Sequence, residues 1–339
     1  MAATSRTAPS DAGRLKQRWS SLLLAPLWDS PTAHKPTDQP RRGHCWHWED
    51  VLRSAQEAAS LTSPEVVERR VLRLVNPDPV SPQDESTVGN LSAAIQILLP
   101  GEVARPHRHS MHALRFVLQG DGATTFVNGQ ALPMRPGDML LTPGNCWHEH
   151  RHDGSEPVIW LDVLDVPLHT ALGTVTFQPG PVIDCPPTLP TEAWSAAGVL
   201  PIDAGGSQSY SPLFHYPAEA VNAALARVPA GPGGMRAVRY VNPSTGGAPM
   251  PTIDCTMVSL EAGQMVPETR STANAVCLIV DGEGETWVGD QHFEWSRYDI
   301  LTFPQKNWIR HRARSAARLF LVSDREALRR LDLLEETQR

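Results

Sequence analysis

Two histidines, one residue apart, end the segment Gly101-Glu-Val-Ala-Arg-Pro-His107-Arg-His109. Side chains alternate between the two faces of a β-strand, so both imidazoles of such a pair lie on one face. A third histidine lies in Pro143-Gly-Asn-Cys-Trp-His148-Glu-His150, which has the pattern of a separate strand. Three imidazoles can bind a divalent metal and leave coordination positions open for a substrate. We therefore predict a metal site made by His107, His109 and His148.

The composition favours a β-rich protein with more than one domain. The chain has 339 residues, enough for two domains, and its 24 glycines and 31 prolines are typical of short strands joined by turns. A formal net charge of -7 argues against nucleic acid or an anionic membrane as a partner. The sequence has no apolar run of about 20 residues and no secretory signal, and its five cysteines lack CxxC spacing. We expect a cytoplasmic protein with reduced thiols.

Short apolar runs separated by turn residues from Ala93 to Pro167 suggest an all-β fold, either a barrel or a sandwich. The metal-binding barrel is expected over 91–178 and a second barrel over 235–323. Residues 1–90 are predicted to form an N-terminal extension of helices and loops, with a strand near its end. Residues 179–234 are rich in Pro, Gly and Ala, with one helical stretch near 218–227, and we interpret them as the connection between the barrels. Residues 324–339 are predicted to form a C-terminal helix.

The second half of the chain repeats the first. The segment Gly120-Asp-Gly-Ala-Thr-Thr-Phe-Val-Asn-Gly129 is echoed by Gly282-Glu-Gly-Glu-Thr-Trp-Val-Gly289. When the two halves are aligned on such anchors, the three predicted metal ligands correspond to Thr269, Ser271 and Ile309. These side chains are poor ligands for iron. We therefore predict that the second barrel binds no metal.

The two histidine segments have the spacing of the cupin motifs. The first motif, G-x5-H-x-H-x3-E-x6-G, is matched by Gly101, His107, His109 and Gly120, and the frame of the second, G-x5-P-x-G-x2-H, by Gly137, Pro143 and His148. The glutamate of the first motif is replaced by Ala113. The predicted site therefore has three histidines and no carboxylate.

Beyond these motifs, the chain resembles the bicupin ring-cleaving dioxygenases of gentisate and salicylates. The resemblance runs from about Leu15 to Ser323, and its signature segments include Gln96–His109, Ala113-Leu-Arg-Phe116 and Val158-Ile-Trp-Leu-Asp-Val-Leu-Asp-Val-Pro167. It implies Fe(II), one per chain, bound in the first barrel only, and commonly a homotetramer. A suitable substrate is an aromatic acid with a hydroxyl ortho to its carboxylate. The carboxylate and the hydroxyl could both bind the iron, and O2 would take the remaining position. The bond cleaved is the one between the carboxyl-bearing and the hydroxyl-bearing ring carbons.

Strand parity suggests two residues that assist this reaction. Arg115 shares a face with His107 and His109, so its guanidinium should point into the barrel, where a carboxylate is the natural partner. The alternative for Arg115 is a structural salt bridge with an internal acid. His150 shares parity with His148 and is a candidate acid or base for the substrate hydroxyl. The alternative is a supporting or surface histidine that takes no part in the reaction.

Three further polar residues are candidates for the site. Asp162 lies in an apolar strand and could orient His150 or a ligand histidine, or make only a structural hydrogen bond. Gln96 interrupts an apolar strand and could meet the substrate or the backbone. Arg70 could bind the substrate carboxylate, or it could be a surface arginine that pairs with Glu68 or Asp78.

The sequence leaves the ring substituents of the substrate open. Gentisate is the most easily oxidised candidate, and salicylate or 1-hydroxy-2-naphthoate remain alternatives. Unusual residues beside the metal strands suggest a substituted salicylate such as 5-nitrosalicylate; they are Met111, His112, Asn145 and Cys146. Outside this class, the alternatives are a cupin that binds an aromatic acid without converting it, and another cupin enzyme such as an isomerase or a manganese decarboxylase.

Overall fold

The computed structural model describes residues 9–30, 40–67, 69–79, 84–182, 185, 189–196, 198–202 and 209–339. The chain forms two compact units, Met1–Gln39 and Pro40–Arg339. The described part of the first unit contains α1 (Pro9–Ser21) and the short 3-10 helix η1 (Leu27–Asp29). The second unit contains all of the β-structure found in the described residues.

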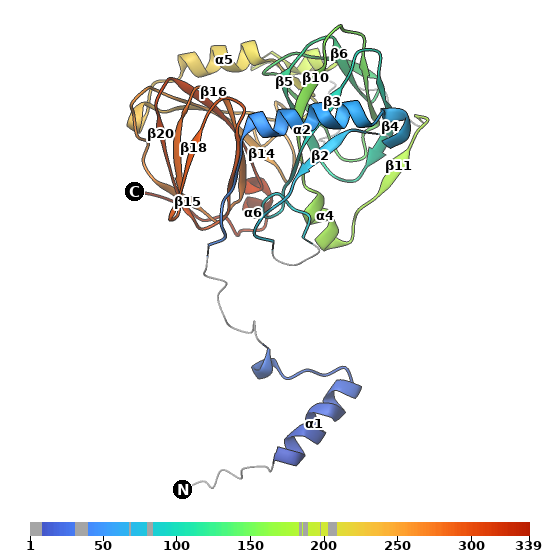
Figure 1. Ribbon diagram of the computed structural model, residues 1–339, viewed down its shortest axis with the longest axis vertical. Helices are drawn as coiled ribbons and strands as arrows, with labels where there is room; N and C mark the ends of the chain where they lie inside the picture. The colour runs from blue at the N-terminus through green and yellow to red at the C-terminus, as the bar shows by residue number, and fades with distance from the viewer. Residues whose placement is uncertain are drawn as a thin grey trace. The chain divides into compact units, whose positions relative to one another are not determined.

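Two antiparallel sheets form the first barrel of the second unit (Figure 1). The six-stranded sheet has the order β12-β8-β5-β10-β3-β2, with β2 Val71–Leu74, β3 Ser92–Leu98, β5 Ala113–Gln119, β8 Met139–Thr142, β10 Val158–Leu164 and β12 His215–Tyr216. The five-stranded sheet has the order β11-β4-β9-β6-β7, with β4 Val103–His109, β6 Ala123–Val127, β7 Gln130–Met134, β9 His148–His152 and β11 Phe177–Pro179. Alternate side chains of β9 are buried, which directs its three histidines into the barrel.

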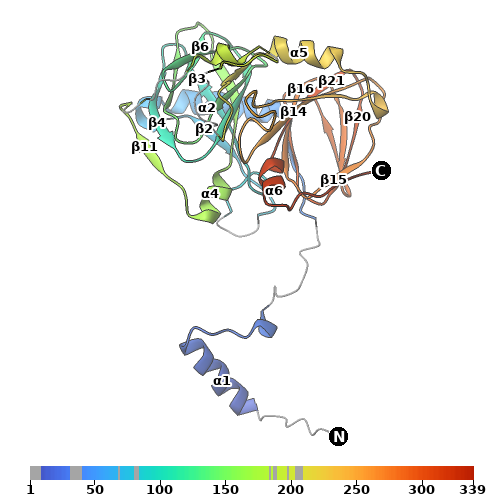
Figure 2. The same cartoon turned by 180° about the vertical axis from the view of Figure 1, so that it is seen from behind.

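The second barrel repeats this arrangement and lies beside the first in both views (Figures 1 and 2). Its six-stranded sheet has the order β1-β19-β16-β21-β14-β13, with β1 Cys45–Trp46, β13 Arg236–Arg239, β14 Asp254–Leu260, β16 Ala275–Asp281, β19 Ile300–Phe303 and β21 Ala317–Ser323. Its five-stranded sheet has the order β18-β17-β20-β15-β22, with β15 Thr269–Ser271, β17 Gly284–Val288, β18 Gln291–Trp295, β20 Trp308–Ala313 and β22 Glu336–Gln338. The predicted all-β bicupin fold is confirmed.

Two glycines of the repeat explain why its turns look alike. Gly120 has a φ of 80°, and a Cβ there would lie 2.3 Å from the carbonyl oxygen of Pro157. Gly282 has a φ of 85°, and its Cβ would lie 2.5 Å from the carbonyl oxygen of Ala316. A side chain at either position would combine an unfavourable backbone conformation with a steric overlap. The glycines therefore fix the same turn in both barrels.

One hydrophobic cluster of buried residues includes side chains of both barrels, and a separate cluster lies within the second barrel. Phe116 of the first barrel stacks on Phe320 of the second, with ring centroids 4.4 Å apart. Tyr298 of the second barrel donates its hydroxyl hydrogen to the carbonyl oxygen of Leu118, at 2.7 Å. These contacts join the six-stranded sheets, so the five-stranded sheets, including the one that carries the histidines, lie away from the junction.

The remaining helices cover the barrels or connect them. They are α2 (Trp48–Leu61), α3 (Pro64–Val67), α4 (Val166–Leu172), α5 (Ala218–Arg227), α6 (Arg325–Arg330), and the 3-10 helices η2 (Thr191–Trp194) and η3 (Pro232–Gly234). The apolar face of α2, which includes the buried Ala55, packs against β3. The helix predicted near 218–227 is confirmed as α5. In the described residues, no helix is both long and apolar enough to cross a membrane.

All five cysteines are free thiols, as predicted.

The ends of the second unit differ from the boundaries predicted from sequence. Strand β1 of the N-terminal extension pairs with β19 of the second barrel, and β2 pairs with β3 of the first. The predicted C-terminal helix ends at Arg330, and β22 follows it. Strand β22 pairs with the open edge of β15, and Glu336 forms an ion pair of 2.6 Å with Arg325. Backbone pairing at a sheet edge therefore prevails over the helical pattern of the last residues.

Candidate metal centre

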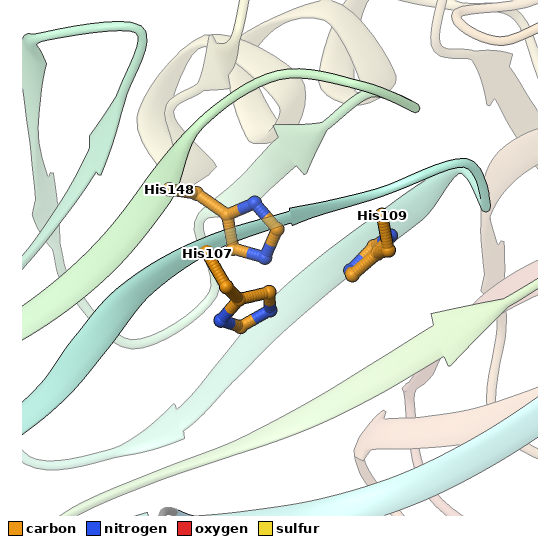
Figure 3. A group of neighbouring side chains, drawn as sticks. All are labelled: His107, His109 and His148. Atoms are coloured by element: carbon orange, nitrogen blue, oxygen red, sulfur yellow. The ribbon is translucent and has the colours of Figure 1, made fainter. Parts of the chain in front are cut away.

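The three histidines predicted as metal ligands come together inside the first barrel (Figure 3). His107 on β4 lies directly opposite His148 on β9, and His109 follows on the same face of β4. The three candidate ligand atoms all lie within 4.8 Å of one another. Each side chain is buried, with 4%, 7% and 3% of the surface of His107, His109 and His148 exposed. This geometry can hold one metal ion.

Hydrogen bonds and burial prepare two of these imidazoles for a metal. Nδ1 of His109 lies 2.9 Å from the carbonyl oxygen of Met111, and Nδ1 of His148 lies 3.0 Å from that of Cys146. An imidazole that donates from Nδ1 keeps its lone pair on Nε2. Burial lowers the pKa of His109 to about 4 and that of His148 well below its usual value. Both rings are therefore neutral at neutral pH, as metal binding requires.

The arginine that lies beside the three histidines is Arg69. Its Nη2 contacts Nδ1 of His107, and its Nη1 lies 3.4 Å from Nε2 of His150. Burial and the Arg69 charge lower the pKa of His107 to about 2. A guanidinium only donates, so the imidazole nitrogens are the acceptors in these contacts. The positive charge of Arg69 beside the cluster favours an anionic ligand there.

Arg70, which was predicted to bind the substrate, is directed elsewhere. Only 4% of its surface is exposed, and its guanidinium forms an ion pair with Glu102 and donates to the carbonyl oxygen of Thr62 at 2.9 Å. Consecutive residues of an extended segment point to opposite sides. The sequence signal was therefore the pair of adjacent arginines, but it could not show which one faces the site.

Arg115 lies inside the barrel, as strand parity predicted. It is 2% exposed, and its Nε donates to Oδ1 of Asp162 at 3.1 Å. Its charge contributes to the lowered pKa of all three histidines of the cluster. Among the described residues, its Nη1 has no hydrogen-bond partner. A buried donor without a partner costs about 1–3 kcal/mol, so an anionic ligand beside the cluster would satisfy it.

Asp162 positions Arg115. Its second carboxylate oxygen accepts a hydrogen bond from Nε1 of Trp160 at 2.8 Å, so its contacts within the described residues are with Arg115 and Trp160. The predicted orientation of His150 by Asp162 is absent from these contacts. Gln96 lies on β3 opposite Trp160 and is 2% exposed. A substrate contact for Gln96 stays a prediction.

His150 is fully buried on β9, two residues after His148. Its Nδ1 lies 2.9 Å from Oγ1 of Thr125, and its ring centroid lies 5.4 Å from that of Trp160. Burial, followed by the charge of Arg115, lowers its pKa well below the usual value, so the ring is a neutral acid–base group. The location inside the barrel removes the alternative of a surface histidine.

An apolar wall at the site was not predicted from sequence. Phe177 on β11 lies with its ring 5.0 Å from that of His107, and 54% of its surface is exposed. Strand β11 lies at the predicted end of the first barrel, residue 178. Its pairing with β4 brings Phe177 opposite His109. An exposed aromatic side chain beside the histidines can contact a flat ring.

The register of the second barrel supports the alignment of the two halves. Thr269 on β15 lies opposite Ile309 on β20, as His107 lies opposite His148. A different group of possible ligands, Cys45, His47 and Asp299, lies near β1. Burial raises the pKa of Cys45 to about 12, and Asp299 accepts a hydrogen bond of 2.7 Å from the backbone N–H of Trp48. A protonated thiol and an engaged carboxylate make this group a poor metal site.

The lowered histidine pKa values predict that the iron-free protein loses stability in acid. Burial lowers the pKa of His109 and of His311 from 6.5 to about 4. Between these values the unfolded chain binds protons that the folded chain does not, so the free energy of unfolding falls as the pH falls. Each group contributes up to about 1.4 kcal/mol per pH unit. Denaturant unfolding between about pH 7.5 and 5 measures this slope, and His311→Gln should reduce it. A slope that is unchanged in His311→Gln would contradict the assignment.

Two antiparallel barrels in one chain, one of which gathers three buried histidines, define a bicupin protein with a candidate metal centre. A family model described as Cupin domain matches residues 94–164. The chain is 36% identical to gentisate 1,2-dioxygenase 1 of Aquipseudomonas alcaligenes over 93% of each chain. It is 31% identical to 5-aminosalicylate 1,2-dioxygenase of a Comamonas species over 96% of this chain and 90% of that one.

A solved structure agrees with these relatives. Salicylate 1,2-dioxygenase of Pseudoaminobacter salicylatoxidans, in an adduct with gentisate, superposes with a TM-score of 0.90. It is 28% identical, and the match covers 100% of this chain and 96% of that one. The chain belongs to the family of gentisate and salicylate 1,2-dioxygenases, which are ring-cleaving enzymes. The resemblance stated from the sequence is confirmed.

Proposed function

We propose that this protein is an Fe(II)-dependent dioxygenase that cleaves the ring of an aromatic acid with a hydroxyl ortho to its carboxylate. The observation that carries the proposal is the open cluster of three histidines, with two arginines close to it. Imidazole nitrogens suit iron, and the absence of a carboxylate ligand at Ala113 leaves positions for a bidentate substrate. Both oxygen atoms of O2 enter the product, so the reaction needs no external reductant.

His107, His109 and His148 would hold the metal. When bound, Fe(II) supplies the coordination positions at which the aromatic acid and dioxygen meet. The protein residues bind and orient the acid around it. Arg69 and the unpaired Nη1 of Arg115 are donors for the substrate carboxylate. Asp162 keeps Arg115 in place, and Phe177 provides an apolar surface for the ring.

His150 is proposed to accept the proton of the substrate hydroxyl at Nε2. The ring is neutral and buried, and Nδ1 is already engaged with Thr125, so Nε2 is the nitrogen left for a ligand. Its contact with Arg69, which we assign to the carboxylate, supports a position of Nε2 beside the bound acid. A general base in such a position contributes roughly 10²–10⁴-fold to a rate.

For the substrate, we propose gentisate first and a 5-substituted salicylate second. The test is oxygen uptake by the iron-loaded enzyme with gentisate, salicylate, 5-chlorosalicylate, 5-nitrosalicylate and 1-hydroxy-2-naphthoate. We expect oxygen consumption equal to the acid consumed, with loss of the aromatic absorbance, and the order of kcat/KM identifies the substrate. If iron is fully bound and none of these acids supports oxygen uptake, the proposal is wrong, and a protein that only binds aromatic acids becomes the better account.

Arg69→Gln should weaken substrate binding. Because hydrogen bonds to charged groups are worth about 1.5–3 kcal/mol, we expect KM to rise by roughly tenfold or more, with a smaller change in kcat. Arg70→Gln is the adjacent control. The loss of the Arg70 guanidinium leaves the Glu102 carboxylate without its ion pair. We therefore expect Arg70→Gln to cost on the order of 3 kcal/mol of stability and to leave KM nearly unchanged. If Arg70→Gln raises KM and Arg69→Gln does not, the roles of the two arginines are reversed.

We further propose one Fe(II) per chain in the first barrel, a homotetramer, and a location in the cytoplasm. The family resemblance supports the tetramer. The free state of all five cysteines suits a reducing compartment. Metal analysis and sedimentation of the purified full chain test the first two points. A ratio of two irons per chain would contradict a single site.

A further inference from the structure

We propose that Thr125 is a positioning residue that fixes the tautomer of His150. Thr125 holds the hydrogen of His150 on Nδ1, so that Nε2 keeps its lone pair for the substrate. The inference rests on the proposed function, because His150 acts on the substrate there. It concerns a residue of a different strand, which acts through its contact with His150.

Thr125 lies on β6 directly opposite His150 on β9. Its side chain is fully buried, and its Oγ1 has two partners among the described residues. One is Nδ1 of His150, at 2.9 Å, and the other is Sδ of Met134, at 3.2 Å. A hydroxyl has a single hydrogen to donate, so the two partners cannot both receive it.

The direction of the hydrogen bonds follows from the other end of the imidazole. Nη1 of Arg69 contacts Nε2 of His150, and a guanidinium only donates. Nε2 is therefore the acceptor, and Nδ1 of the neutral ring carries the hydrogen. Nδ1 then donates to Oγ1 of Thr125, whose own hydrogen is directed to the thioether of Met134, which only accepts. The donors thus run from Arg69 through His150 and Thr125 to Met134.

The second barrel contains an equivalent threonine–histidine pair, but the hydrogen bond between the two side chains runs in the opposite direction. Thr286 on β17 lies opposite His311 on β20, and Oγ1 lies 2.8 Å from Nδ1. Nε1 of Trp295 donates to this Oγ1 at 2.8 Å. An indole N–H only donates, so among the described partners of Thr286 only Nδ1 of His311 can accept the buried hydroxyl hydrogen. The Thr286 hydroxyl therefore donates to His311, whose own hydrogen lies on Nε2.

One position of the repeat accounts for this difference. Met134 ends β7 opposite Ala123, and Trp295 ends β18 opposite Gly284, so the two residues occupy equivalent places in the barrels. Met134 accepts the hydroxyl hydrogen of Thr125, so Thr125 can receive a hydrogen bond from its histidine. Trp295 offers no acceptor, so the hydroxyl hydrogen of Thr286 is directed to its histidine. The first barrel, which has the histidine cluster, is the one in which Nε2 keeps its lone pair.

The test compares three variants of the iron-loaded full chain. Thr125→Val removes the hydroxyl with little change of shape, Thr125→Ser keeps it, and Thr286→Val is the matched change in the second barrel. We expect Thr125→Val to lower kcat roughly tenfold, the effect of one lost hydrogen bond, with KM and bound iron unchanged. Thr125→Ser should restore most of kcat, and Thr286→Val should leave kcat and KM as they are.

A second readout does not depend on activity. Nitrogen NMR of the iron-free full chain, labelled in its histidines, shows which ring nitrogen carries the hydrogen. His150→Gln and His311→Gln identify the signals. We expect the hydrogen on Nδ1 of His150 and on Nε2 of His311 in the same spectrum, and a mixture of tautomers at His150 in Thr125→Val.

These outcomes separate the inference from the proposed function. If the wild-type enzyme cleaves no aromatic acid, the proposed function fails, whereas the NMR spectrum still decides the tautomer. If the wild-type enzyme is active and Thr125→Val has the same kcat, Thr125 is not a positioning residue. Equal tautomers at His150 and His311 would also overturn the inference.

Discussion

His107→Ala is expected to lose bound iron and ring cleavage together. The substitution removes one of three imidazoles that lie within 4.8 Å of one another, and two remaining ligands do not complete a site with this geometry. We expect the activity to fall by roughly 10³-fold or more. Iron content after anaerobic loading and oxygen uptake measure the two effects on the same sample.

Thr269→Ala provides the matched control. Thr269 has the same register in the second barrel as His107 has in the first, so the change is made at an equivalent backbone position. We expect unchanged iron content and unchanged activity. Full activity in His107→Ala would remove the three-histidine site from the account, and loss of iron in Thr269→Ala would show that the second barrel binds metal.

Arg115→Leu is expected to lose both stability and activity. The side chain is 2% exposed, and its removal leaves the Asp162 carboxylate buried without its ion pair. Breaking a buried pair in this way costs about 3–5 kcal/mol of unfolding free energy. The loss of the donor that we assign to the substrate should lower kcat/KM by about 10²–10³-fold.

A double variant separates these two effects. Asp162→Asn removes the unpaired charge and keeps an oxygen that can accept from Nε1 of Trp160. In Arg115→Leu with Asp162→Asn, we therefore expect much of the stability to return, as measured by denaturant unfolding, while kcat/KM stays low. Recovery of kcat/KM together with stability would show that Arg115 is only structural.

The sequence predicted the part of the site that depends on local spacing. Strand parity places the His-x-His pair on one face, and the third histidine was assigned from its place in the second cupin motif. Arg115 and His150 followed from the same parity. Each of these residues lies within a few positions of the histidine segments, where the strand pattern is unambiguous.

Residues that enter the site from elsewhere could not be predicted in this way. Arg69 and Arg70 are adjacent, and only the course of the chain before β2 shows which one faces the histidines. Phe177 reaches the site because β11 pairs with β4, a contact between segments far apart in sequence. The role of Thr125 depends on which strand lies opposite β9 and on the residue at Met134.

The ends of the chain show the same limit. Helix α5 was predicted because its apolar pattern is local, and the C-terminal helix was overextended for the same reason. The last residues form β22 because β15 offers an unpaired edge, and β1 joins the second barrel through β19. Such pairings depend on the whole fold, so a local pattern does not contain them.

The fate of dioxygen tests the central claim most directly. The iron-loaded enzyme is given ¹⁸O2 and the acid that supports the fastest oxygen uptake, and the product is analysed by mass spectrometry. We predict a ring-opened product that contains both labelled oxygen atoms from one molecule of O2. An intact ring, or a product with one labelled atom and one from water formed in a single turnover, would contradict ring cleavage by this site.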